Sequence, residues 1–196
     1  PSFHLIDAAA LARLPDHAIL VNASRGEVVA GAALEAALAA RPGLTAVLDV
    51  WEGEPVVDPG LLARVRFGSP HVAGYSQEGK WRGTAQVCAA LCAHFGLAPP
   101  PPLESLLAAM PAPAPLQPAG TGKAQRLAAL LQQACPLPRD DAALRASLAA
   151  PDPGAAFDAL RRHYPARREF TAQRVALPAD DALWPLLQGL GFRPVA

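Results

Sequence analysis

The chain has 196 residues, of which 52% are hydrophobic and 17% are charged, with 17 basic and 17 acidic side chains. Because no net positive field exists to attract a polyanion, we expect no nucleic-acid partner. Prolines interrupt the least charged stretches, so we also expect no membrane-spanning helix. A chain with so many hydrophobic and so few charged residues leaves apolar surface that a partner subunit could cover, and we therefore expect a homo-oligomer.

The first half of the sequence alternates helix and strand signals. Short apolar runs such as Ala18–Asn22 are typical of strands buried on both faces of a parallel sheet. The expected elements are a helix over Asp7–Leu14 with Asp7 as N-cap, strands over Ala18–Asn22, Thr45–Val50 and Val65–Gly68, and helices over Gly31–Ala40 and Gly79–Phe95. This alternation predicts an α/β fold with a parallel sheet.

From Ala98 to Gly122 the composition shifts to proline, alanine and glycine, which is typical of an extended connection. We therefore expect a first domain over residues 1–97, a linker over residues 98–122 and a C-terminal domain over residues 123–196. The last domain is expected to contain helices over Lys123–Cys135, Asp140–Ala149, Gly154–Tyr164 and Asp181–Leu190, and extended stretches over Glu169–Leu177 and Phe192–Val195. It would be a small α+β domain.

The cysteines are Cys88, Cys92 and Cys135, an odd number in a chain large enough to fold without disulfides. This usage predicts a reducing, cytoplasmic setting. Cys88 and Cys92 would share one face of a helix, but no second Cys or His pair accompanies them. We expect packing rather than a metal site.

Three stretches place polar or ionisable residues directly after strand signals, where open parallel sheets bind their ligands. They are Asn22–Val29, Leu48–Pro55 and Ser69–Ser76. Together they supply a cation in Arg25, a carboxylate in Glu54 and an imidazole in His71. Oxidation of an alcohol beside a carboxylate group needs a base for the hydroxyl proton, an acid that holds the base, and a cation that orients the substrate. Each residue alone could be a surface or loop residue, but their joint order favours catalysis.

These stretches resemble the D-2-hydroxy acid dehydrogenase family, whose second half carries Arg-Gly, Asp-Val-x-x-x-Glu-Pro and Pro-His motifs in this order. The resemblance implies that Arg25 binds the substrate carboxylate and reactive oxygen, that His71 exchanges the hydroxyl proton, and that Glu54 orients the imidazole. It also implies the second half of a Rossmann-like domain with NAD as cofactor. The residues implied to contact NAD are Ala23, Ser24, Arg25, Asp49 and Gly74.

The continuation of the last motif, over residues 71–87, resembles one branch of this family. That branch acts on a phosphorylated 2-hydroxy acid and forms a homodimer through a small C-terminal domain. Tyr75 would contact the substrate there, and Lys80 or Arg82 could approach its phosphate. The alternatives are a dehydrogenase for another 2-hydroxy acid, such as 3-phosphoglycerate, and a dimerising NADH sensor without turnover. The small C-terminal domain argues against the former, and the intact catalytic residues weigh against the latter.

Other features depart from the family or stay outside its motifs. The 15 glycines include no Gly-x-Gly-x-x-Gly pattern, and no substrate-domain half is present. We therefore expect the natural N-terminus to lie upstream, and this chain by itself to bind NAD weakly and to be inactive. A basic cluster is expected on a solvated or interfacial face because acids lie nearby. It consists of Arg161, Arg162, Arg167 and Arg168.

Overall fold

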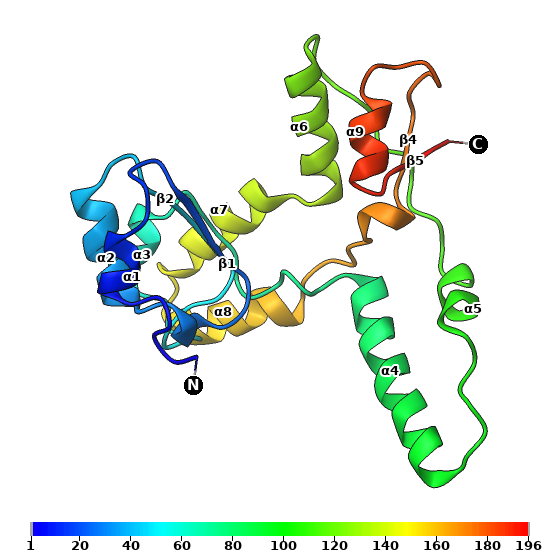
Figure 1. The fold of residues 1–196 in the computed structure, drawn as a ribbon, viewed down its shortest axis with the longest axis horizontal. Coiled ribbons are helices and arrows are strands. Elements are labelled where there is room, and N and C mark those ends of the chain that lie inside the picture. The colour runs from blue at the N-terminus through cyan, green and yellow to red at the C-terminus, as the bar shows by residue number, and fades with distance from the viewer. Residues whose placement is uncertain (1, 196) are drawn as a thin grey trace. The chain divides into compact units, whose positions relative to one another are not determined.

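The computed structural model describes residues 2–195, which form two compact units (Figure 1). The first unit extends to Ala73 and also includes Leu137–Tyr164. The second consists of Gly74–Pro136 and the chain from Pro165 onward. This division differs from the domain boundaries expected from composition, because Leu137–Tyr164 packs in the first unit instead of the C-terminal domain.

Three parallel strands form the sheet of the first unit, in the order β1-β2-β3. They are β1 (Ile19–Asn22), β2 (Thr45–Leu48) and β3 (Phe67–Gly68). Ile19 lies opposite Thr45, and Val47 opposite Phe67. All three expected strands are present, although each is shorter than expected, β1 by one residue and β2 and β3 by two. The predicted α/β class with a parallel sheet is confirmed.

The expected burial of the strands on both faces holds for one face only. Ala46 and Leu48 of β2 are buried in the core, whereas Ile19 and Val21 of β1 are 69% and 63% exposed. Successive strand residues point to opposite faces. The face that carries Ile19 and Val21 is therefore open within residues 2–195.

Local sequence signals explain where three helices of the first unit begin, because an aspartate caps each of them. The helices of this unit are α1 (Ala8–Ala12), the 3-10 helix η1 (Gly26–Val28), α2 (Gly31–Ala40), α3 (Pro59–Arg64), α7 (Leu137–Ser147) and α8 (Pro153–Arg162). As predicted, Asp7 caps α1 by accepting a hydrogen bond from the Ala10 N–H at 2.8 Å. Helix α3 was not expected, although Asp58 and Pro59 are typical of an N-cap and first helical position.

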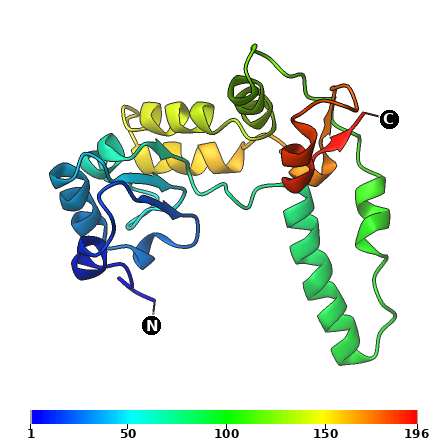
Figure 2. The same ribbon diagram turned by 45° about the horizontal axis from the view of Figure 1, so that its top comes forward.

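Helices α7 and α8 belong to the first unit because they complete its core (Figure 2). Leu144 of α7 and Phe157 of α8 are fully buried in the cluster that contains Leu48. The Asp141 carboxylate also accepts a hydrogen bond from the Gly68 N–H at 2.7 Å. Arg145 donates to the carbonyl oxygens at the end of α3 and just beyond it. The sheet edge at β3 is thus bound by a helix rather than by another strand.

The second unit has its own core and a two-stranded sheet. Its elements are α4 (Gln77–Phe95), α5 (Leu103–Ala108), α6 (Lys123–Ala134), the 3-10 helix η2 (Phe170–Ala172), β4 (Arg174–Val175), α9 (Trp184–Gly189) and β5 (Arg193–Pro194). Leu130, Val175, Leu187 and Phe192 are buried together. The strands β4 and β5 pair in parallel, with Arg174 opposite Arg193.

The expected linker over residues 98–122 is more ordered than its composition predicts. It contains α5, and Leu116 is buried in the core of the second unit. The Leu116 N–H donates to the Arg174 carbonyl at 2.8 Å, and the Leu116 carbonyl accepts from Ala176 at 3.0 Å. Leucine retains the backbone N–H that the neighbouring prolines lack, so this position can join β4. Among the described residues, none of the helices is both long and apolar enough to cross a membrane.

Candidate active site

The loop that follows β1 is fixed by the side chain of Asn22, which is buried. Its Nδ2 donates to the Arg25 carbonyl at 2.9 Å, and its Oδ1 accepts from the Ser24 N–H and Oγ at 3.1 and 2.8 Å. Ala23, Ser24 and Arg25 are exposed on this loop, and the Arg25 Nη1 donates to the Ser24 carbonyl at 2.7 Å. Asn22 therefore presents the loop that bears the candidate substrate-binding cation.

Gly26 joins this loop to the one that follows β2. A Cβ at position 26 would lie 2.1 Å from the Trp51 carbonyl carbon and 2.4 Å from the Glu52 nitrogen. Only glycine lets the two backbones approach this closely. The Arg-Gly motif thus has a structural reason, since Gly26 brings Arg25 to the backbone that leads to Glu54.

Asp49, at the end of β2, is buried and holds the loop that follows β3. Its carboxylate accepts hydrogen bonds from Ser69 Oγ at 2.6 Å, and from the backbone N–H groups of Val72 and Ala73, both at 2.9 Å. The Asp49 carbonyl also accepts from the His71 N–H at 2.7 Å. A buried carboxylate that accepts this many hydrogen bonds orders the loop around it.

His71 lies at the centre of that loop in the left-handed region, with φ 55°. Such a conformation costs about 1–3 kcal/mol for a residue other than glycine and persists only where the surroundings enforce it. The hydrogen bonds to Asp49 enforce it here. The His71 Nδ1 lies 2.5 Å from Glu54 Oε1, and Glu54 Oε2 accepts from the Trp51 N–H at 3.2 Å. The imidazole and its carboxylate are both about three-quarters buried, at 24% and 21% exposure.

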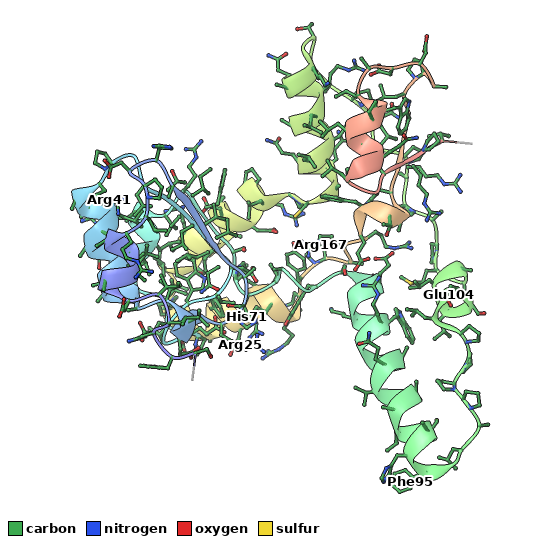
Figure 3. The ribbon with its side chains drawn as sticks, in the orientation of Figure 1. Arg25, Arg41, His71, Phe95, Glu104 and Arg167 are labelled. Atoms are coloured by element: carbon green, nitrogen blue, oxygen red, sulfur yellow. The ribbon has the colours of Figure 1, made fainter. Side chains whose placement is uncertain are left out.

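The ends of β1, β2 and β3 therefore bring the cation, the carboxylate and the imidazole to one edge of the sheet. Figure 3 shows Arg25 and His71 at the same end of the first unit, away from Arg41. Trp51 also binds the third loop, because its Nε1 donates to the Ser69 carbonyl at 3.0 Å. A base with a carboxylate behind it, beside an exposed guanidinium, can exchange a proton with a hydroxyl group of a bound acid.

The loop that carries Glu54 has a second anchor, which the sequence did not reveal. Glu52 Oε1 lies 2.6 Å from His4 Nε2, and its Oε2 accepts from the Gly31 N–H at 2.9 Å. The hydrogen bond from His4 lowers the pKa of Glu52 below its ordinary value. Together with Asn22 and Ser69, these residues position the site, although none of them is a defined residue of the Arg-Gly, Asp-Val-x-x-x-Glu-Pro or Pro-His motifs. Asn22 could have been found, because a short polar side chain directly after a strand commonly bonds to its own turn.

Gly74 and Tyr75 belong to the second unit. The Lys80 ammonium lies over the Tyr75 ring, 4.6 Å from its centroid. Arg82, which could have approached a substrate phosphate, instead forms two hydrogen bonds with the Glu169 carboxylate, at 3.0 and 3.1 Å. This pairing lowers the pKa of Glu169 below its ordinary value. No cluster of three or more His, Cys, Asp or Glu side chains within residues 2–195 could hold a metal ion.

Comparison with known proteins shows similarity to two family models. Residues 2–73 match the family model described as D-isomer specific 2-hydroxyacid dehydrogenase, NAD binding domain. Residues 110–191 match a second model, described as a domain of unknown function. The resemblance drawn from the three motifs is confirmed for residues 2–73, and so is an NAD-binding domain of the expected α/β class.

Two curated relatives match along nearly the whole chain, and both carry the name erythronate-4-phosphate dehydrogenase. The protein from Stutzerimonas stutzeri is 48% identical over 98% of this chain and 51% of its own length. That from Azotobacter vinelandii is 45% identical over 100% of this chain and 52% of its own. The chain thus spans about half the length of these relatives. A solved D-isomer specific 2-hydroxyacid dehydrogenase from Polaromonas sp. JS6 66 is 27% identical, with a TM-score of 0.42, over 50% of this chain and 31% of that one.

Proposed function

Since residues 2–73 belong to the NAD-binding domain family of the D-isomer specific 2-hydroxyacid dehydrogenases, we propose that the chain is the C-terminal half of an erythronate-4-phosphate dehydrogenase. The enzyme would oxidise 4-phospho-D-erythronate to (R)-3-hydroxy-2-oxo-4-phosphooxybutanoate, in pyridoxal phosphate (vitamin B6) biosynthesis. The observation that carries the proposal is the 2.5 Å contact between His71 and Glu54 at the sheet edge that also bears Arg25.

In this mechanism His71 takes the proton of the substrate hydroxyl at Nε2, because Nδ1 is engaged by Glu54. The carboxylate fixes the ring and stabilises the positive charge that the imidazole gains. The Arg25 guanidinium binds the substrate carboxylate and the oxygen that becomes the carbonyl, since its planar fork matches two oxygen acceptors. In the reverse direction His71 returns the proton. Tyr75 would contact the substrate.

The sheet edge also suits NAD, because open parallel sheets bind dinucleotides at the carboxyl ends of their strands. The exposed residues Ala23, Ser24 and Arg25 would border the cofactor. The resemblance to the family implies that Gly74 would also contact NAD. Asp49 would act on this site mainly through the loop that its carboxylate holds. When bound, NAD supplies the acceptor for the electrons that the alcohol loses.

A substrate panel on the full-length enzyme tests the proposal. With NAD present, we expect 4-phospho-D-erythronate to be oxidised with a kcat/KM at least about 100-fold above that of 3-phosphoglycerate, because a site built around an additional hydroxyl discriminates strongly against its absence. NADH formation is measured by absorbance. Equal values for the two substrates would favour the broader family activity, and no turnover of either would favour the NADH sensor.

We propose further that the enzyme is a cytoplasmic homodimer joined through its C-terminal domain. All three cysteines are free, which is typical of a reducing compartment. Leu186 and Leu190, four positions apart at the end of α9, are 40% and 38% exposed and so share one apolar face. Light scattering during size-exclusion chromatography is expected to give twice the mass of one subunit, and Leu186→Glu to reduce it to one. Gln188→Glu, an exposed change on the same helix, is the control, and a parent protein that already runs as a monomer contradicts the proposal.

A further inference from the structure

A cavity of about 490 Å³ lies in the second unit, between α5 with the chain that follows it and the segment that contains η2, β4 and β5. Figure 1 shows this part of the chain running from α5 toward the β4–β5 pair. One side of the cavity is apolar and includes Leu107, Met110 and Pro113. The other side carries charged residues. The volume of the cavity is in the range of small-molecule sites.

The charged side contains one ion pair, between Glu78 and Arg168, whose two charges cancel. Glu78, only 3% exposed, lies at the start of α4, and its Oε1 accepts a hydrogen bond from Arg168 Nε at 2.5 Å. Its Oε2 accepts from the Glu169 N–H at 2.9 Å, and Arg168 also donates to the Pro111 carbonyl. This ion pair is largely buried, with 14% exposure of the Arg168 side chain and 3% of that of Glu78, so it fixes the wall of the cavity without adding net charge.

Arg174 and Arg193 complete the charged side. They are directly opposite one another in the parallel pair of β4 and β5, so their side chains leave the sheet on the same face. Like charges placed opposite each other across strands repel. No ion pair or side-chain hydrogen bond joins either guanidinium to another described residue. Three guanidinium groups and one carboxylate therefore leave two net positive charges on the lining.

We propose that this cavity binds a small organic phosphate, with the phosphate between Arg174 and Arg193 and an apolar body against Leu107 and Met110. A phosphomonoester carries up to two negative charges near neutral pH, which matches the excess charge of the lining. A guanidinium group can donate hydrogen bonds to two oxygens of one phosphate at the same time. The anion would also remove the repulsion between the two arginines. The inference does not rest on the proposed dehydrogenase activity, because it uses neither Arg25 nor His71.

Isothermal titration of the full-length protein with phenyl phosphate and with inorganic phosphate tests this inference. Phenyl phosphate is expected to bind saturably, and Arg174→Gln combined with Arg193→Gln to weaken it at least tenfold, about the loss expected for hydrogen bonds to a charged group. Arg162→Gln, which removes an exposed arginine of α8 in the first unit, is expected to leave binding unchanged. Equal affinity in the double variant and the parent would overturn the proposal.

Two further comparisons separate this cavity from the candidate active site and test its apolar side. Arg25→Gln is expected to retain phenyl phosphate binding, whereas loss of binding in that variant alone would assign the phosphate to the active site and overturn the inference. Met110→Asn is expected to weaken phenyl phosphate several-fold and to leave inorganic phosphate unchanged, because only the former has an apolar body. Equal affinities of the two phosphates for the parent protein would contradict the organic ligand class.

Discussion

Replacing His71 with alanine in the full-length enzyme is expected to lower kcat by about 10²–10⁴-fold and to change the affinity for NADH little. The imidazole is the group at the sheet edge that we assign to exchange the hydroxyl proton, and Glu54 holds its Nδ1. None of the backbone assigned to NAD belongs to His71. Steady-state kinetics give kcat, and a fluorescence titration gives the dissociation constant of NADH.

Two companion variants separate lost chemistry from a disturbed loop. Alanine at position 71 must adopt φ 55°, which strains the loop that Asp49 holds. His71→Asn avoids this, because asparagine tolerates the left-handed conformation, and we expect it to lose as much turnover as the alanine variant. His17→Ala removes an exposed histidine of the same unit and is expected to be neutral. Turnover that survives in His71→Asn would remove the imidazole from the mechanism.

The helices and strands that the sequence predicts well are those determined by local signals. Helix α2 has the bounds expected from its apolar spacing, and α1 begins after the predicted cap at Asp7. Helix α3 was missed because it has six residues, although Asp58 and Pro59 already marked its start. The position of α7 could not be predicted in the same way. It depends on contacts such as the hydrogen bond between Gly68 and Asp141, which are 73 residues apart.

The same distinction applies to the site. Three motifs after strand signals were enough to expect Glu54 and His71 at one edge, and the structure brings the two side chains together. Their catalytic roles stay predictions. The function of Asp49 was less accessible, because the resemblance pointed to NAD whereas its carboxylate holds the His71 loop. A motif gives the residue at a position, but only the fold shows which of its atoms already form hydrogen bonds within the protein.

Gly26→Ala tests how far the site depends on backbone packing. We expect this change to lower the free energy of unfolding by about 3 kcal/mol, the upper end of the usual range for overpacking. The added Cβ would meet the carbonyl group of Trp51 at about 2 Å, and backbone atoms, unlike a side chain, have no rotamer with which to yield. Urea denaturation followed by circular dichroism measures the loss. Because the displaced loop carries Arg25, kcat/KM is also expected to fall, by about 10²-fold for a shift near 1 Å.

Gly154→Ala is the matched control, since it adds the same methyl group at another buried glycine of the first unit. There the new Cβ would lie 3.5–3.6 Å from its neighbours, an ordinary contact distance. Position 154 is also helical, where alanine is favoured over glycine by up to about 1 kcal/mol. We therefore expect stability to be unchanged or slightly increased. If both variants lose the same stability, the close approach of Gly26 to Trp51 is not what joins the Arg25 loop to the loop of Glu54, and the Arg-Gly motif needs another explanation.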